Sequence, residues 1–350
     1  MQRFIIREDA FDLEFLTIDK LDTGNDCSFW SEIIGDGYVL QQRLIVPPHL
    51  AADAEIYDIN SIDKSKANLP LIFTGHGDLP VQYSAVVARL KKDSARSEKN
   101  NGAIKIVADG IEFLYSAPVF CLPGTTDHSF FASFRKISTI LQEHRMQESA
   151  IARTWLFLEN ILRDYEILND ARKRFFDQWY SPDTSRFIPA STGIQGRVTG
   201  NNILSIEFCA FSGRNISMNQ IFSPLQNEPT TYDKLFSRAV AVNFPRNKLV
   251  FISGTAAIDK AGRSVHLGDF ESQMIFTLEV LKALLQEAGG TFSNVAQAII
   301  YLKNSNDLSS CKSILDEVGF PRKKALFMPD VDVCREDLLF EIEATAVMSR

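Results

Sequence analysis

The stretch that decides the fold is AQAIIYLKNSNDLSSCKSILDEVGF (residues 296–320), followed by ALFMPDVDVCREDLLFEIEATAV (residues 325–347). Its apolar pattern predicts a strand, a helix and then a pair of strands, the last of which carries Glu341 and Glu343. Residues two apart in a strand share a face, so these two carboxylates point the same way. The residues that face the other way are all apolar: Phe340, Ile342, Ala344 and Ala346.

Glu341 is the candidate catalytic residue of this strand. A carboxyl group on a strand whose other face is apolar tends to be partly desolvated, which raises its pKa and suits it to proton transfer. The same pattern is typical of a structural glutamate whose charge is satisfied by its neighbours, and the spacing does not separate the two interpretations. The organisation of the rest of the chain favours a catalytic role for Glu341.

Composition narrows the classes of function. A chain of 350 residues is long enough for two domains. The apolar runs are too short to span a bilayer, and the N-terminal stretch lacks the apolar centre of a signal peptide. A net charge of −7 without a basic stripe argues against nucleic acid as a partner. The five cysteines lack metal-ligand or CxxC spacing, which indicates reduced thiols in a cytoplasm and predicts neither a metal nor a cofactor.

The chain carries two successive series of elements. In the first, apolar segments of residues 37–120 predict strands, with a loop at residues 93–102. A helix within 125–145, a strand at 149–160, a helix at 161–179 and two strands within 186–212 follow. The second series has strands at 235–242 and 248–259 and a helix within 266–290, and it ends with the stretch quoted above.

The two series align with each other in a weak but ordered way. RTWLFLEN (residues 153–160) aligns with QAIIYLKN (residues 297–304), and Glu207 aligns with Glu343. In this register Ser205 takes the place of Glu341, so only one copy keeps the acid. Such long-period similarity indicates a duplicated domain. We predict an α+β fold of two tandem domains, each a mixed sheet covered by two helices. The predicted boundaries are an N-terminal domain (1–215), a linker (216–235) and a catalytic domain (236–350).

These segments resemble a known family. FISGTAAID, GDFESQMIFTLEVLKALLQEAGG, NVAQAIIYLKN and DLLFEIEATAV look like the Rid (YjgF/L-PSP) family over residues 236–350. RTWLFLEN, PASTGI and ILSIE look like a degenerate second copy of the same unit. The combination of FSRA, SGTAAI, VHLGD, RTW, PASTGI and DVCREDLLFEIE resembles the chorismatase family of tandem Rid-like domains.

The resemblance to single-domain Rid proteins implies deamination of imines and enamines at a site with an arginine, a tyrosine and a glutamate. Glu341 matches the glutamate of this set. Phe236 stands where the tyrosine is expected, and Arg322 is an ambiguous match to the arginine. Rid domains form trimers with sites between subunits, so a homotrimer is a possible assembly. A Rid-type deaminase is therefore retained as an alternative.

The resemblance to chorismatases implies hydrolysis of chorismate with release of pyruvate, in which Glu341 is the proton donor to the enolpyruvyl methylene. Cys334 and Arg335 match the Cys-Arg pair that lines the family's pocket, with Cys334 as a second catalytic candidate. Arg153 matches an arginine that reaches the substrate across the domain interface. The chain departs from the pattern at Lys303, where the family has an arginine. It departs again at Asn219, which is near the place of a family tyrosine.

The leading hypothesis is therefore a cofactor-free, chorismatase-like enzyme of secondary metabolism that acts on an enolpyruvyl-bearing acid. Such a small anionic substrate needs cations, and Arg153 with Lys303 are the first candidates, followed by Arg335 and Arg322. Ser253 and Thr255 are candidates for contacts through the backbone. The third hypothesis is a non-catalytic protein that binds an aromatic carboxylate.

Overall fold

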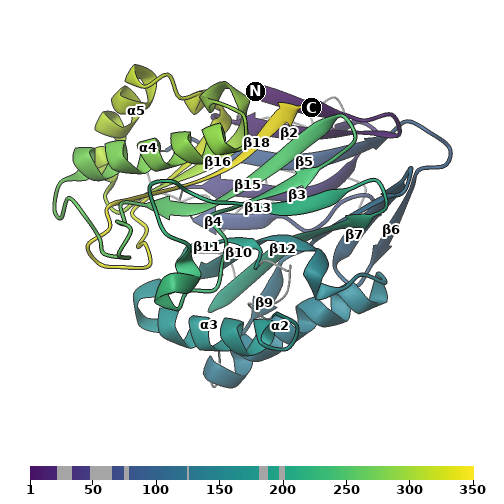
Figure 1. Cartoon of the computed structure of the whole chain (residues 1–350), viewed down its shortest axis with the longest axis horizontal. Helices are drawn as coiled ribbons and strands as arrows, with labels where there is room; N and C mark the ends of the chain where they lie inside the picture. The colour runs from purple at the N-terminus through teal and green to yellow at the C-terminus, as the bar shows by residue number, and fades with distance from the viewer. Residues whose placement is uncertain (22–33, 48–64, 75–78, 124–125, 181–187, 197–201) are drawn as a thin grey trace.

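The computed structural model describes residues 1–21, 34–47, 65–74, 79–123, 126–180, 188–196 and 202–350. Three β-sheets follow one another along the chain (Figure 1). The N-terminal sheet has the strand order β1 (Gln2–Arg7), β2 (Phe11–Ile18), β5 (Gln82–Leu90), β3 (Tyr38–Val46) and β4 (Leu71–Thr74).

The middle sheet and the C-terminal sheet carry the helices. The middle sheet has the order β11 (Ala190–Gln195), β10 (Ile151–Leu158), β12 (Leu204–Gly213), β8 (Ile111–Ser116), β7 (Ala103–Ala108) and β6 (Arg96–Asn100). Its short strand β9 (Val119–Cys121) also pairs with β12. The C-terminal sheet has the order β13 (Ser217–Ile221), β14 (Ala239–Asn243), β15 (Asn247–Ala256), β18 (Phe340–Ser349), β16 (Val295–Leu302) and β17 (Ala325–Pro329). The α-helices that the described residues define in full are α2 (Thr126–Glu143), α3 (Ile161–Phe176), α4 (Phe270–Glu287) and α5 (Leu308–Glu317).

The predicted α+β class and its tandem Rid-like units are confirmed by the middle and C-terminal sheets with their helices. Both predicted repeats have the expected order of strand, helix, strand, helix and strands. The loop predicted at residues 93–102 is wrong, because strand β6 lies there and forms a hairpin with β7. The segment predicted as a linker at 216–235 includes β13, which pairs with β14.

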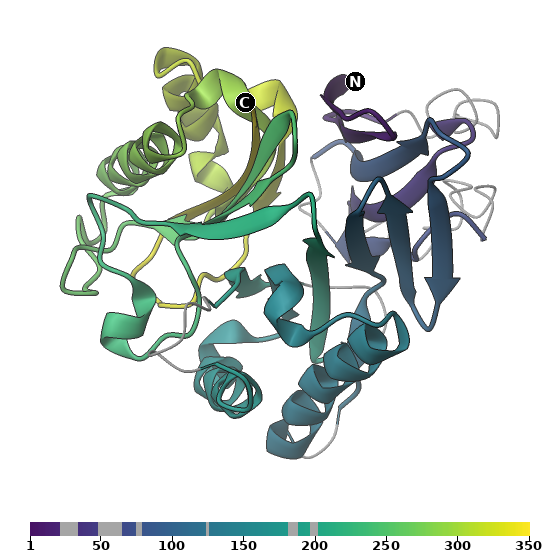
Figure 2. The ribbon, with the colours of Figure 1, turned by 45° about the vertical axis from the view of Figure 1, so that its right-hand side comes forward.

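The N-terminal sheet repeats the same strand order without having been recognised as a unit in the sequence. Its β2, β5, β3 and β4 are arranged as β8, β12, β10 and β11 are in the middle sheet, and as β15, β18, β16 and β17 are in the C-terminal sheet. In each set the last two strands are parallel and the others are antiparallel. The three sheets surround a shared interior, as Figure 2 shows.

Two features of the sequence fix this arrangement locally. Helices α3 and α4 begin after Asn160 and Asp269, whose side chains accept hydrogen bonds from the backbone N–H groups of Arg163 and Ser272. The apolar face of β18 packs in the same cluster as α4, whereas the inner faces of all three sheets contribute to one central core. Glu341 and Glu343 lie on the inward face of β18, as the alternation predicts, and both are buried.

Candidate functional site

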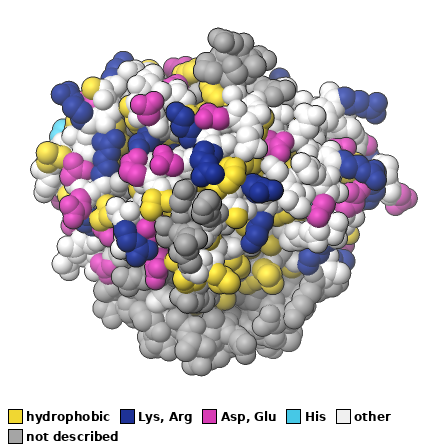
Figure 3. Space-filling view, turned by 90° about the horizontal axis from the view of Figure 1, so that it is seen from below, with side chains coloured by type: hydrophobic (Ala, Val, Ile, Leu, Met, Phe, Trp, Pro, Cys, Tyr) yellow, Lys and Arg dark blue, Asp and Glu magenta, His cyan; other side chains and the backbone are white. Residues whose placement is uncertain are grey.

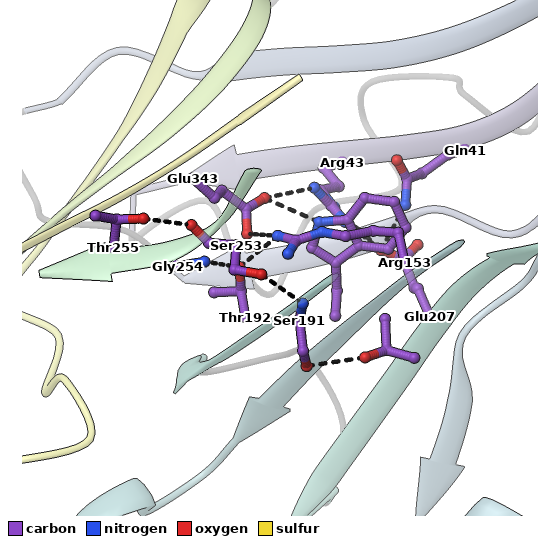
Figure 4. A network of polar contacts seen from close by, with 12 residues as sticks. Gln41, Arg43, Arg153, Ser191, Thr192, Glu207, Ser253, Gly254, Thr255 and Glu343 are labelled. Atoms are coloured by element: carbon purple, nitrogen blue, oxygen red, sulfur yellow. Dashed lines mark hydrogen bonds and ion pairs between the residues drawn. The ribbon is translucent and has the colours of Figure 1, made fainter. Parts of the chain in front are cut away.

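A network of buried charges joins the three sheets in the interior (Figure 4). Arg43 of β3 donates to Glu207 Oε2 of β12 at 2.8 Å and to Glu343 Oε1 of β18 at 3.4 Å. Arg153 of β10 donates to Glu343 Oε2 at 2.8 Å. Each of the four side chains is almost fully buried. Two cations and two anions thus compensate each other where all three sheets meet.

Trp155 organises this network from β10. Its indole Nε1–H donates to Glu343 Oε1 at 3.0 Å, and the Arg43 guanidinium lies 4.7 Å from the centre of its ring. Burial alone lowers the pKa of Arg43, but the charges of Glu207 and Glu343 outweigh burial and raise it above its usual value. A cavity of about 10 Å³ between Arg43, Arg153 and Glu343 is the size of one water molecule.

Arg153 is predicted from the sequence to bind the substrate, and the structure places it in an ion pair with Glu343. One of its terminal nitrogens donates to both Glu343 and the Thr192 hydroxyl of β11, while the other, Nη1, is buried without a hydrogen-bond partner among the described residues. Thr192 also accepts a hydrogen bond from the Gly254 N–H at 3.0 Å. Arg153 therefore holds the middle sheet against the C-terminal sheet, and its charge still lowers the pKa of nearby Glu341.

Glu341 is in a different state from Glu343, two residues along the same strand. It is 4% exposed, and no hydrogen bond or ion pair within the described part of the chain holds its carboxyl group. Burial and the neighbouring charge of Glu343 raise its pKa to about 8, although Arg153 and Arg238 act in the opposite direction. Glu341 is therefore mostly protonated at neutral pH.

Gly254 of β15 makes room for this carboxyl group. A methyl group added at Gly254 lies 2.1 Å from Glu341 Oε1 and 3.1 Å from the Thr192 side chain. A larger residue at Gly254 would therefore force the Glu341 carboxyl group out of its present position. Ser253 and Thr255, the predicted substrate contacts on either side, are buried. Ser253 Oγ accepts from the Ser191 N–H at 2.9 Å, and Thr255 donates to the Ser253 carbonyl.

The corresponding positions in the other two sheets lack an acid. Glu341 lies opposite Tyr301, as Ser205 lies opposite Phe157 in the middle sheet and Gln82 opposite Ile45 in the N-terminal sheet. Gln82 joins the N-terminal sheet to β17, because its side chain accepts a hydrogen bond from the Phe327 N–H at 2.9 Å and donates one to the Phe327 carbonyl at 3.0 Å. Ser205 Oγ is buried without a partner among the described residues. Of the three positions, only Glu341 supplies a titratable carboxyl group.

The surroundings of Glu341 come from α3, from the segment before β14 and from the segment before β18. Tyr165 of α3 lies over Gly193 of β11 and interacts with the thiol of Cys334. Burial raises the pKa of Cys334 to about 12, so the thiol stays neutral and is a poor nucleophile. Cys334 therefore acts as a small, neutral and polarizable side chain beside Tyr165.

The remaining predicted residues are distributed unevenly around this acid. The Phe236 ring lies 5.7 Å from the Arg172 guanidinium and 5.6 Å from that of Arg238, and Arg238 acts electrostatically on Glu341. Arg335 is partly buried and donates to Ser264 Oγ at 3.4 Å. Lys303 forms an ion pair with Asp332 at 3.4 Å and donates to the Glu336 carbonyl at 2.6 Å.

Two more residues named in the sequence analysis lie elsewhere. Asn219 is exposed on β13, where its side chain accepts a hydrogen bond from Asn243. Arg322 forms an ion pair with Asp316, the two atoms 2.6 Å apart, near the end of α5. Neither residue is part of the cluster around Glu341.

Sequence reasoning missed Arg172 and Arg238. Arg238 belongs to the quoted FSRA segment, and it donates to the Asn227 carbonyl and to the Tyr232 hydroxyl. Arg172 lies four residues after Leu168 on the apolar stripe of α3, and both are buried. A cation on an apolar stripe, and a cation directly before an apolar strand, are the sequence signals that point to both residues.

Other classes of site find no support in the described residues. Within them, no cluster of three or more His, Cys, Asp or Glu side chains is suitable for a metal ion. None of the described helices combines the length and the apolar character that crossing a membrane requires. On the face seen in Figure 3, which looks at the molecule from below Figure 1, Lys and Arg side chains are interspersed with Asp and Glu.

The chain is similar to several known proteins. Residues 226–348 match the family model described as Endoribonuclease L-PSP. A RutC family protein of Pyrococcus abyssi is 30% identical over 111 residues, which cover 32% of this chain and 84% of that protein. A 3-hydroxybenzoate synthase of Streptomyces hygroscopicus is 26% identical over 223 residues, which cover 57% of this chain and 64% of that protein.

The architecture of the whole chain has a counterpart among solved structures. A chorismatase crystal structure aligns with a TM-score of 0.69 at 20% identity, and the match covers 97% of this chain and 100% of that one. This likeness extends the shared fold beyond the C-terminal sheet to all three sheets. The chain therefore belongs to the RutC (Rid, L-PSP) family, within which it is a divergent member with a chorismatase-like fold.

Proposed function

We propose that this protein is a chorismatase-like enzyme that hydrolyses the enol ether of chorismate or a related enolpyruvyl-bearing aromatic precursor and releases pyruvate, with Glu341 as the proton donor. The observation that supports this most strongly is the state of Glu341. Its carboxyl group is buried and unpaired among the described residues, and its pKa of about 8 keeps it protonated at neutral pH. A general acid of this pKa suits a reaction near neutral pH.

The reaction needs a proton at carbon. An enol ether is inert until its terminal methylene is protonated, which gives an oxocarbenium ion. Water or a substrate hydroxyl then adds to that ion. The adduct with water loses a proton to give a hemiketal, whose C–O bond to the ring breaks. The ring oxygen takes up a proton and leaves as the ring alcohol, and the remaining fragment is pyruvate. Glu341 supplies the first proton and becomes a carboxylate, which the nearby charges of Arg153 and Arg238 stabilise.

The relatives support the same class of substrate at the level of the family. A chorismatase has the same fold over nearly the whole chain, and a 3-hydroxybenzoate synthase is a sequence relative. The alternative of a Rid-type deaminase uses the same glutamate as a base toward water. A carboxyl group with a pKa of about 8 is a poor match for that role at pH 7, because most of it is protonated.

The assembly and location stay predictions. The seam that holds Glu341 is built within one chain, from β18 and β15 on one side and β11 with α3 on the other. A homotrimer is therefore not needed to complete this site. In single-domain Rid proteins, by contrast, the sites are expected to lie between subunits. The cytoplasmic location rests on the cysteine pattern.

The direct test is to incubate the protein with chorismate and to measure pyruvate by a coupled assay between pH 6 and 9. We expect release of pyruvate, and a fall of at least about 100-fold in kcat for Glu341→Gln, the size of effect usual for a general acid. Because the acid form is the active one, the rate should fall as the pH rises above about 8.

The matched control is Glu336→Gln, an exposed glutamate five residues earlier, which should keep the wild-type rate. No pyruvate from the wild-type protein, or a Glu341→Gln variant that is as active as the wild type, contradicts the proposal. Binding of chorismate without turnover supports the third hypothesis, a non-catalytic binding protein.

A further inference from the structure

A cavity of about 140 Å³ lies where one hairpin turn from each of the three sheets comes together. The turns are residues 8–11 between β1 and β2, 108–111 between β7 and β8, and 244–247 between β14 and β15. The third turn is at the opposite end of β15 from Gly254, roughly 20 Å along the strand. The cavity is therefore separate from the region around Glu341.

Part of the cavity lining is apolar. Ala10 and Phe11 of the first turn and Ile111 of the second are buried, and Pro245 of the third is exposed at the edge. A cavity of this volume has room for several water molecules or for a ligand of about five non-hydrogen atoms. Apolar walls favour a ligand that carries a short hydrocarbon chain over a bare ion.

Three carboxylates also line the cavity, and two of them have a cation as partner. Asp9 pairs with Arg246 at 2.5 Å. Asp109 pairs with Lys92 at 2.7 Å. The third carboxylate, that of Glu8, forms no ion pair with the described residues. The lining and its ion-pair partners therefore carry one negative charge in excess.

Glu8 is 4% exposed, and one of its two carboxylate oxygens has no partner. Oε1 accepts hydrogen bonds from the Asn247 side chain at 2.8 Å and from the Arg246 backbone N–H at 3.3 Å. Oε2 accepts none from the described residues. The Lys91 ammonium pairs with Asp12 and donates to the Glu8 backbone carbonyl rather than to its side chain. A buried carboxylate that lines a cavity with an unused oxygen is suited to hold a cation.

The donor set favours an organic cation over a metal ion. Ca²⁺ takes about six to eight oxygen ligands, whereas the carboxylates of Asp9 and Asp109 are already engaged by cations. A second acceptor at the cavity is the amide of Asn215, whose Nδ2 donates to the Asp109 carbonyl at 2.6 Å. Asn215 Oδ1 has no partner among the described residues. Glu8 Oε2 and Asn215 Oδ1 together suit one group with several N–H donors.

We propose that this cavity binds a primary alkylammonium ion, with the charge at Glu8 Oε2 and the hydrocarbon chain against Phe11 and Ile111. An ammonium group has three N–H donors, which suits Glu8, Asn215 and a water molecule. Because the site joins hairpins of all three sheets, a bound cation stabilises the folded chain. The proposal is independent of the function proposed for Glu341.

The test is a calorimetric titration of the full chain with n-butylammonium chloride at constant ionic strength, with n-butanol as the neutral match. We expect n-butylammonium to bind at least about tenfold more tightly than n-butanol and to raise the melting temperature. Glu8→Gln should weaken the binding of n-butylammonium by at least about tenfold. Asp93→Asn removes an exposed negative charge next to Lys92 and outside the cavity lining, and it is expected to leave binding unchanged.

A purely structural role for Glu8 predicts a different pattern. Glutamine keeps an oxygen for Arg246 and Asn247, so Glu8→Gln without ligand should melt at the wild-type temperature or above it. If Glu8 is only structural, the variant melts at a lower temperature and n-butylammonium stabilises both proteins equally. Asn215→Leu is the second variant, in case Glu8→Gln does not fold. It removes an exposed acceptor and should also weaken the binding of n-butylammonium.

The ammonium group can belong to a free amine or to a lysine side chain of another protein. A titration with Nα-acetyl-lysine N-methylamide distinguishes these sources. Binding as tight as that of n-butylammonium assigns the site to a lysine side chain, and weaker binding assigns it to a free amine. Three results overturn the proposal: no binding of n-butylammonium by the wild type, equally tight binding of n-butanol, or wild-type affinity in both Glu8→Gln and Asn215→Leu.

Discussion

Glu341→Gln is expected to unfold at a higher denaturant concentration than the wild type at pH 9, although it removes the proposed catalytic acid. Burial raises the pKa of Glu341 in the folded state to about 8, from an ordinary value of 4.5. The stability that the neutral carboxyl contributes is therefore complete below about pH 4.5 and is lost as the pH rises through about 8. The shift in pKa between the unfolded and folded states corresponds to about 5 kcal/mol of folding stability at pH 9 as an upper estimate.

The measurement is urea denaturation followed by circular dichroism at pH 5 and pH 9. We expect wild type and variant to differ little at pH 5 and by several tenths of a molar or more in midpoint at pH 9, on the order of a few kcal/mol. Glu336→Gln, an exposed site, serves as the control and should show no pH-dependent gain. A variant that is less stable than the wild type at pH 9 means that the carboxylate is held in its charged form, which contradicts our account.

Glu343→Gln is expected to have the opposite effect on stability. Glu343 accepts hydrogen bonds from Arg43, Arg153 and Trp155 in the interior. A neutral amide leaves Arg153 without its only ion-pair partner among the described residues and weakens the contact with Arg43. Breaking one side of a buried ion pair costs about 3–5 kcal/mol, because the remaining charges stay buried.

The same denaturation experiment at pH 7 checks this second prediction, and Glu341→Gln, two positions earlier on the strand, is the matched control. Two carboxylates on one face of β18 should thus give changes of opposite sign. Because the network is buried, the loss in Glu343→Gln should persist in 1 M salt. A Glu343→Gln variant as stable as the wild type shows that the three sheets do not depend on this ion-pair network.

Periodicity predicted those parts of the fold in which one face of an element is apolar. Helices α3 and α4 and strand β18 have this pattern, and they occur where it places them. The N-terminal sheet was not recognised as a third unit, because its similarity to the others lies in strand order rather than in residues. Strand β6 reads as a loop because its sequence is RSEKN, and pairing with β7 overrides this low propensity.

The site was predictable only in part for a related reason. The alternation of residues along β18 places Glu341 and Glu343 on one inward face, but it does not distinguish the function of one carboxylate from that of the other. Their difference comes from partners distant in the sequence, since Arg43 and Arg153 reach Glu343 and leave Glu341 without a hydrogen bond among the described residues. Arg172 was not selected from the sequence, because tertiary packing decides whether an arginine on a helix is buried.

The protonation state of Glu341 can be measured by a ¹³C NMR titration of protein labelled at the glutamate side-chain carboxyl carbon. The resonance that is absent from Glu341→Gln belongs to Glu341. The account predicts that this resonance titrates near pH 8, so that the carboxyl group is mostly protonated at pH 7. A resonance that titrates near the ordinary value of 4.5 contradicts the account, because Glu341 then has no proton to donate at neutral pH.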